Sequence, residues 1–232
     1  MSVYAFSDLH GNGILWDKIK SFLSEDDKAY FLGDACDRGP DGWRILKEIL
    51  ADERIVFLKG NHDDLLAQRI LRPTSQKNIK NHEENGGGAT WDEVVREERE
   101  TQISIAHLIN NLPLKAEYIN KNGLTIRMTH SGAYSPTDDD EALWNREHFC
   151  HPLDEPIVLV HGHTPIPFIE DKLLEIKAFN PSLKVEKWTG GAYWYFGTKC
   201  CIDCGSVWTN QSVLLNLDTF DEEIFTVGVF EI

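Results

Sequence analysis

The sequence has no long apolar run and a shortage of basic residues, and both shortages exclude classes of protein. No apolar stretch of about 18 residues occurs, so a membrane-spanning helix is not expected. Lys and Arg total 23 against 38 Asp and Glu, which gives a formal charge of -15. This charge argues against nucleic acid or an anionic membrane as partner. The first six residues lack the basic start of a secretory leader and are expected to form a strand.

Cysteine is also scarce. The odd count of five, with three clustered near residue 200, does not match a disulfide framework, so a cytoplasmic location is expected. A zinc knuckle at Cys200, Cys201 and Cys204 is the alternative, but no second Cys or Cys/His pair stands nearby. Buried thiols along a strand are the favoured interpretation.

Apolar runs alternate with helical periodicity in the first 60 residues. Strands are expected at residues 3–6, 29–32 and 54–58, and helices at 14–23 and 43–50. This alternation predicts parallel strands joined by crossover helices.

Beyond residue 60 the pattern changes. Residues 63–112 are expected to be helical, with breaks at Arg72-Pro73 and at residues 86–88, and a helical cap is placed at about 72–112. A hairpin is predicted for 114–128, followed by a second sheet made of 157–160, 199–203, 212–217 and 224–230. Together these features predict an α/β fold, a two-sheet β-sandwich flanked by helices, in a single domain spanning 1–232.

Five short polar motifs each follow an apolar run. They are Asp8-Leu9-His10, Gly33-Asp34-Ala35-Cys36-Asp37-Arg38-Gly39, Gly60-Asn61-His62-Asp63, Thr129-His130 and His161-Gly162-His163-Thr164. One Asp-x-His triplet arises easily by chance, but five pieces in this order do not. Sites in such sheets form beyond the carboxyl ends of strands, where the first three motifs are expected.

Carboxylate, imidazole and amide groups are the ligands expected for Mn, Fe or Zn. Asp8 and His10 point to the same side of an extended segment and can therefore ligate one ion. Asp34 is expected to bridge two ions, and Asn61 to offer an amide oxygen to the second. His130 and His163, at separate strand ends, are the remaining candidates, with His161 weaker. Two ions about 3.5–4 Å apart can share a water that becomes the nucleophile for in-line attack on a phosphate ester.

His62 is interpreted as a general acid over the leaving group, with Asp37 holding its tautomer. Two alternatives stay open: a salt-bridged turn at 37–40, and a capping role for His62 and Asp63 at the next helix. The remaining histidines are interpreted as surface or packing residues; they are His82, His107, His148 and His151.

With these residues in place, the chain resembles the calcineurin-like metallophosphoesterases. Within them it is most similar to the phosphoprotein phosphatase group, and especially to the lambda-phage type serine/threonine protein phosphatases. The likeness rests on the five motifs above. Weaker similarities are found at Asn85-Gly86-Gly87-Gly88, Leu143-Trp144-Asn145-Arg146-Glu147 and Ile202-Asp203-Cys204-Gly205-Ser206-Val207.

The resemblance implies a role for each matching residue. One ion would be held by Asp8, His10 and Asp34, and the second by Asp34, Asn61, His130 and His163. Arg38 and Arg146 would bind phosphate oxygens, which suits the planar guanidinium group. The chain departs from the pattern at Asp63, where many protein phosphatases have Glu, and at Lys59, which precedes the third motif where a further phosphate-binding Arg is missing.

The expected function is hydrolysis of phosphomonoesters, first of all phosphoserine or phosphothreonine in proteins, by direct attack of a metal-bound hydroxide. Mn is the expected metal, with Fe or Zn as alternatives. Asp63 keeps a symmetrical dinucleoside tetraphosphate hydrolase open as the second candidate. The third is a non-catalytic phosphate-binding regulator, against which His62 and Arg38 argue. The expected partner is a phosphorylated protein or small phosphoester, and the oligomeric state is left open.

Overall fold

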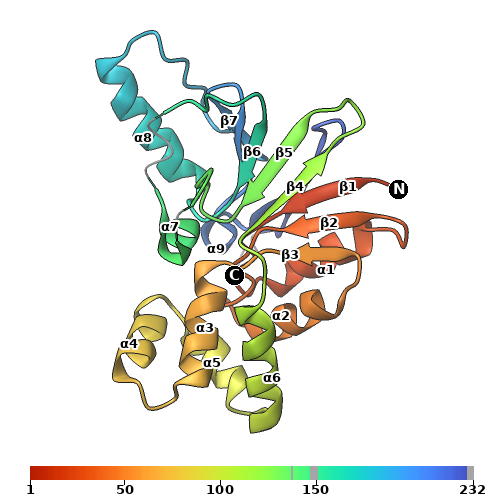
Figure 1. Ribbon diagram of the computed structural model, residues 1–232, viewed down its shortest axis with the longest axis vertical. Coiled ribbons are helices and arrows are strands. Elements are labelled where there is room, and N and C mark those ends of the chain that lie inside the picture. Colours follow the sequence, from red (N-terminus) through yellow and green to blue (C-terminus); the bar gives the residue numbers. More distant parts are fainter. Residues whose placement is uncertain (137, 147–150, 229–232) are drawn as a thin grey trace.

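The computed structural model describes residues 1–136, 138–146 and 151–228, and this part of the chain forms two five-stranded sheets flanked by helices (Figure 1). The strands are β1 Val3–Phe6, β2 Lys28–Phe31, β3 Ile55–Phe57, β4 Lys115–Ile119, β5 Thr125–Thr129, β6 Val158–His161, β7 Tyr193–Tyr195, β8 Lys199–Cys201, β9 Gln211–Asn216 and β10 Glu222–Thr226. The helices are α1 Gly13–Phe22, α2 Gly42–Ala51, α3 Asn61–Leu71, α4 Gln76–Glu84, α5 Gly88–Val94, α6 Arg99–Asn110, α7 Asp139–Trp144, α8 Ile166–Phe179 and α9 Ser206–Thr209. The predicted two-sheet α/β fold is confirmed.

The first sheet has the order β10-β9-β1-β2-β3, with β1, β2 and β3 parallel as predicted. The second has the order β4-β5-β6-β8-β7. Its β4 and β5 form the predicted antiparallel hairpin, while β5, β6 and β8 run parallel. The carboxyl ends of β1, β2 and β3 and those of β5 and β6 therefore supply two sets of loops to the site.

One part of the predicted topology is wrong. Residues 212–217 and 224–230 were expected in the second sheet, but β9 pairs antiparallel with β1 and carries β10 at the edge of the first. Four consecutive residues of β9, Ser212 to Leu215, are buried, because this strand is covered on both faces. The end of the predicted strand, residues 229–230, lies outside the described residues.

Alternation along the strands divides the core into two clusters. Val3 and Ala5 of β1 pack in one cluster with Met128 and Val160 of the second sheet. Phe6 points to the other face and packs on Trp16 of α1, with ring centroids 6.2 Å apart. One cluster thus joins the sheets, and the other joins the first sheet to its helices.

The segment after β3 is helical as predicted and has the two predicted breaks, but it has a further break at residues 95–98 that was not predicted. Helices α3, α4, α5 and α6 are separated at Arg72-Pro73, at Gly86-Gly87 and again before Arg99. Figure 1 shows them gathered at one end of the molecule, below the carboxyl end of β3. Among the described residues, none of the helices combines the length and apolar character needed to cross a membrane.

Candidate metal centre

Five of the six predicted ligands lie in loops that follow strands, and the sixth, Asn61, is the first residue of α3. In chain order the six are Asp8, His10, Asp34, Asn61, His130 and His163. Backbone hydrogen bonds tie these loops together: the N–H of Asp8 donates to the carbonyl of Gly33, and that of His10 to the carbonyl of Asp34, both at 3.0 Å. These backbone contacts join loops that are distant in sequence, and they use none of the side chains that would bind a ligand.

The backbone at the site has a conformation that side-chain-bearing residues avoid. Within the described residues, nine non-glycine residues have a positive φ, and six of these belong to the site: Asp8, His10, Asp34, Asp37, Arg38 and His163. Each such residue costs of order 1–3 kcal/mol and persists only where the surroundings impose it. Such strain concentrates where side chains must be aimed at a common point.

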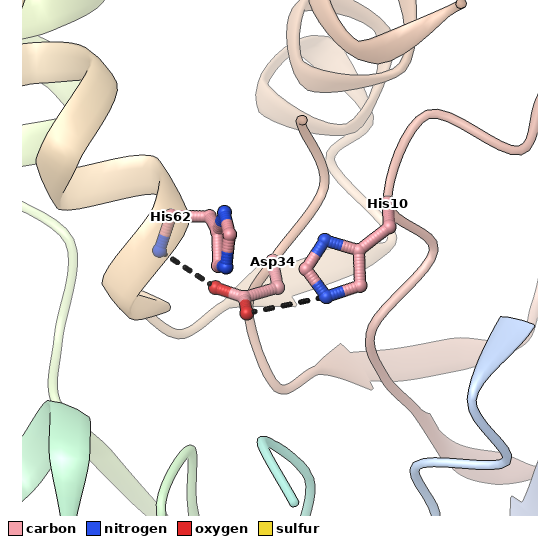
Figure 2. Close-up of side chains that lie close together, drawn as sticks. All are labelled: His10, Asp34 and His62. Carbon is pink, nitrogen blue, oxygen red and sulfur yellow. Dashed lines mark hydrogen bonds and ion pairs between the residues drawn. The ribbon is translucent and has the colours of Figure 1, made fainter. Parts of the chain in front are cut away.

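The Asp34 carboxylate lies at the centre of the cluster. Its Oδ1 accepts the backbone N–H of His62 at 2.9 Å, and its Oδ2 lies 3.5 Å from His10 Nε2 (Figure 2). Oδ1 also lies 3.5 Å from His130 Nε2. A Cβ at Gly60 would come within 2.1 Å of Oδ1, so only glycine leaves room for this carboxylate.

The potential ligand atoms form two groups, each with its atoms within 4.8 Å of one another. One group contains His10, Asp34 and His62, and the other contains Asp34, His130 and His163. Asp34 belongs to both, which is the place that a bridging carboxylate would occupy.

The second group has the electron pairs that a cation needs. His130 Nδ1 donates to the carbonyl of Leu32 at 2.7 Å, so its Nε2 carries a lone pair when the ring is neutral. Burial lowers the pKa of His130 and favours this neutral form. Its Nε2 then faces Asn61 Oδ1, another electron-pair donor, at 2.9 Å. His163 Nδ1 lies 2.9 Å from the same oxygen and donates to it, since His163 Nε2 accepts from Arg146. Carboxylate, amide and imidazole groups together are the ligand types that suit a divalent cation.

The first group is arranged differently around Asp8. His10 donates from Nδ1 to the carbonyl of Cys36 at 3.1 Å, and burial lowers the pKa of His10 to about 3, so Nε2 carries a lone pair. Asp8 accepts the backbone N–H of His163 at 3.0 Å and the hydroxyl of Ser7. Its Oδ1 is 3.9 Å from His10 Nε2. Asp8 therefore lies beside the group of His10, Asp34 and His62 and not within it.

Buried carboxyl groups crowd the site, and most of them resist ionisation. Burial, then Asp203 and Asp34, raises the pKa of Asp8. Burial, with Asp34 adding to it, raises the pKa of Asp63 and that of Asp203 to about 7. Asp34 differs: burial acts to raise its pKa, but the surrounding imidazoles, His130 first, outweigh burial and lower it. Divalent cations would favour the ionised form of these carboxyl groups.

His62 stands at the edge of this cluster with both ring nitrogens in contact. Nδ1 donates to Asp37 Oδ2 at 2.9 Å, and Nε2 lies 2.9 Å from Arg38 Nη2. Arg38 Nη1 also reaches His10 Nε2 at 2.8 Å. Burial acts to lower the pKa of His62, but Asp34 and Asp37 outweigh it and raise that pKa. Asp37 bonds the two imidazoles of His62 and His82, which argues against a turn salt-bridged to Arg38.

Two arginines mark the solvent-exposed side of the site, its mouth. Arg38 and Arg146 are exposed, whereas the six predicted ligands are buried. Arg146 follows α7, and its Nε donates to His163 Nε2 at 3.3 Å. Two exposed tryptophans lie close by: the Trp208 ring is 5.6 Å from the Arg38 guanidinium, and the Trp144 ring is 6.0 Å from His163. Cationic and aromatic groups thus lie together on this side of the site.

The weaker ligand candidate, His161, and the histidines interpreted as surface or packing residues lie in different surroundings. His161 Nε2 faces the Tyr195 hydroxyl at 2.7 Å, away from both ligand groups. His107 and His151 are exposed, and His148 lies outside the described residues. His82 is not an ordinary surface or packing residue: it is fully buried and bonds Asp37 Oδ1 at 2.9 Å.

Asp63 shows why the third motif needs a carboxylate after His62. Its oxygens accept the backbone N–H groups of Gly60 at 3.0 Å, Asp34 at 2.9 Å and Ala35 at 3.1 Å. The bond to Gly60 confirms the capping role at α3. The other two bonds attach the start of α3 to the Asp34 loop, so Asp63 sets the position of Asp34.

Comparison with known families identifies this arrangement. The sequence matches the family described as calcineurin-like phosphoesterase over residues 1–205, and the chain therefore belongs to that family. Its members are metallophosphoesterases that use divalent metals, in agreement with the two ligand groups. A search of curated protein sequences finds no match.

Solved structures share the fold at low sequence identity. A proposed diadenosine tetraphosphatase has a TM-score of 0.61 at 13% identity, covering 98% of this chain and 94% of that one. A metallophosphoesterase from Sphaerobacter thermophilus gives 0.60 at 14%, covering 98% and 89%. A protein serine/threonine phosphatase from Saccharomyces cerevisiae, similar to human phosphatase PP5, gives 0.53 at 17%, covering 98% and 80%. At these identities the likeness establishes the fold and leaves the substrate open.

Proposed function

We propose that this chain is a dinuclear-metal phosphatase that hydrolyses phosphomonoesters, with phosphoserine or phosphothreonine in proteins as the substrate. The observation that carries the proposal is His62, whose Nδ1 is held by Asp37 at 2.9 Å beside the ligand groups that share Asp34. A protein that only binds phosphate needs no positioned acid, so this pair also argues against the non-catalytic regulator.

The two groups would hold the ions through Asp34 as the bridge, with His10 and Asp8 on one side and Asn61, His130 and His163 on the other. Divalent ions at these positions, manganese by preference and iron or zinc as alternatives, supply an activated water and polarise the phosphoryl oxygens.

The chain's own residues supply the remaining steps. Arg38 and Arg146, exposed at the mouth, bind the phosphoryl oxygens and orient the ester. In this structure His62 Nε2 accepts from Arg38 Nη2, and in the proposed step it takes up a proton when Arg38 turns to the phosphoryl oxygens and gives that proton to the leaving oxygen. The Nδ1 bond to Asp37 keeps the ring oriented. The raised pKa of His62, which Asp34 and Asp37 produce against the effect of burial, favours the protonated form that an acid requires.

The substrate preference rests on charge at the mouth. Two arginines suffice for the single dianionic group of a phosphomonoester. A dinucleoside tetraphosphate carries a longer anion, and this chain has a formal net charge of -15. Asp63, which suggested the tetraphosphate hydrolases, faces the backbone of residues 34–35 and 60, so it supports neither substrate.

One observation favours the tetraphosphate as second candidate. Trp208 and Trp144 are 61% and 39% exposed beside Arg38 and His163, where a nucleobase could stack on an indole ring. A substrate panel with manganese distinguishes the candidates: phosphoserine and phosphothreonine peptides, an aryl phosphate, and diadenosine tetraphosphate. We expect the highest kcat/KM on the phosphopeptides. A clear preference for the tetraphosphate, lost in Trp208→Ala, would replace the proposal with the second candidate.

A further inference from the structure

His82 of α4 is a buried polar residue that the sequence motifs do not include. Its side chain has no exposed surface, and its Nε2 lies 2.9 Å from Asp37 Oδ1. The other oxygen of Asp37 accepts His62 Nδ1 at 2.9 Å. One carboxylate therefore lies between two imidazoles, and 20 residues of chain separate these histidines.

The contacts of His82 define which nitrogen carries the proton. Arg69 Nη1 lies 3.1 Å from His82 Nδ1, and a guanidinium has only donors to offer. Nδ1 is therefore the acceptor, and Nε2 carries the hydrogen that is donated to Asp37. The order of donation is Arg69 to His82, His82 to Asp37 and His62 to Asp37.

The surroundings leave His82 little freedom. Arg69 is itself held by Glu83 at 3.0 Å and stacks on Trp91, with its guanidinium carbon 3.9 Å from the ring centroid. A Cβ at Gly87 would come within 2.3 Å of the His82 ring, so glycine at this position is required for the ring to lie there.

The segment from α4 to α5 also holds the backbone around Asp37. Thr90 Oγ1 accepts the Asp37 N–H at 2.8 Å, and the carbonyl of Gly86 accepts the Arg38 N–H at 3.0 Å. Asp37 and Arg38 both have positive φ, a conformation that needs such external support.

We propose that His82 is a positioning residue for the general acid, because its bond to Oδ1 fixes the rotation of the Asp37 carboxylate and so presents Oδ2 to His62. Without it, the carboxylate can turn or take up water, and His62 Nε2 loses its aim at the leaving oxygen. The inference rests on the proposed phosphatase activity, and it assigns part of the acid machinery to the helical segment of residues 76–94.

The test compares two leaving groups. His82→Leu should lower kcat on a phosphoserine peptide roughly 10-fold, a part of the 10²–10⁴ that a positioned acid contributes. The aryloxide leaving group of an aryl phosphate departs without protonation. On that substrate the loss of kcat should therefore stay below about 3-fold. His82→Gln, which keeps a donor, should recover most of the activity on the peptide. The matched control is His107→Leu, at an exposed histidine, and it should leave kcat unchanged on both substrates.

A double-mutant cycle separates positioning from general structural damage. In a His62→Asn background, adding His82→Leu should lower kcat on the phosphoserine peptide little further, because both substitutions act on the same proton transfer. Additive losses, or equal losses on both substrates, would overturn the inference. If His82→Leu does not fold, Gly87→Ala displaces the ring without removing it and should give the same dependence on the leaving group.

A spectroscopic readout keeps the inference independent of the substrate. The low-field proton resonance of His62 Nδ1–H should shift in His82→Leu and return in His82→Gln; an unchanged resonance would overturn the inference. A wild-type protein inactive on both phosphomonoesters would reject the proposed function instead, and the resonance would still decide the role of His82.

Discussion

The buried carboxylate of Asp203 should couple protein stability to pH and to metal binding. Asp203 is 2% exposed and accepts the Gly205 N–H at 2.8 Å, and burial, with Asp34 adding to it, raises its pKa to about 7. In the unfolded chain its pKa returns to about 3.8. Between these values the folded protein holds a proton that the unfolded chain has lost. The contribution of Asp203 to the unfolding free energy therefore falls as pH rises, by about 1.4 kcal/mol per pH unit.

Asp203→Asn removes this dependence, so its stability should improve relative to wild type as pH increases. Between pH 5 and pH 8 the metal-free variant should gain on the order of 2 kcal/mol in relative unfolding free energy. Urea unfolding in the presence of a chelator, at several pH values, measures the difference. Only the difference between wild type and variant isolates Asp203, because two histidines add their own pH dependence to both proteins. Burial lowers the pKa values of His10 and His161 to about 3, so their contribution to stability rises with pH below about 6.5.

Divalent metal should act in the opposite direction and stabilise the wild type more than Asp203→Asn. Manganese would place positive charge among Asp8, Asp34 and Asp203, so the wild type should gain more stability from it at pH 8 than Asp203→Asn does. Asp221→Asn, which alters an exposed carboxylate, is the matched control and should show no such effects. A wild-type-to-variant difference that stays constant from pH 5 to pH 8 without metal would refute the reasoning.

Three further predictions concern the metal centre and the mouth. Asp34→Asn should lose both ions and nearly all activity, because Asp34 belongs to both ligand groups; two ions per chain in this variant, by elemental analysis, would contradict that role. His62→Asn should lower turnover on phosphoserine peptides by about 10²–10³ with metal content unchanged, and an equal loss on an aryl phosphate would point to a structural role. Arg146→Ala should raise KM for phosphopeptides roughly 10-fold, as expected from one charge-assisted hydrogen bond, and should leave the metal content intact; an unaltered KM and kcat would remove Arg146 from the substrate site.

The sequence predicts the strand-end loops well because their information is local. Apolar runs such as residues 3–6 and 29–32 define the parallel strands, and a parallel sheet brings the loops that follow them to one edge. The placement of β9 and β10 failed for the opposite reason. The pattern of residues 212–217 shows a buried strand but not its neighbour, and the pairing of Leu215 with Ala5 depends on which edge of β1 is free.

The sequence pattern also did not predict how the side chains of the first motif are oriented. Asp8 and His10 were expected to face one ion from an extended segment, yet both have positive φ, so the alternation of a strand does not apply to them. The structure turns Asp8 toward the backbone of His163, a contact across 155 residues that no local pattern encodes.

His82 contacts the proposed acid pair but belongs to none of the five sequence motifs. The proposed metal ligands other than Asn61 come from strand-end loops, whereas the partners of Asp37 come from α3, α4 and the start of α5. The ion-binding part and the acid-positioning part of the site are thus carried by different portions of the chain, joined through Asp37 and Arg38. A change within residues 76–94 can therefore alter proton transfer while leaving the metal ligands in place, and the leaving-group dependence of the His82 variants measures that separation directly.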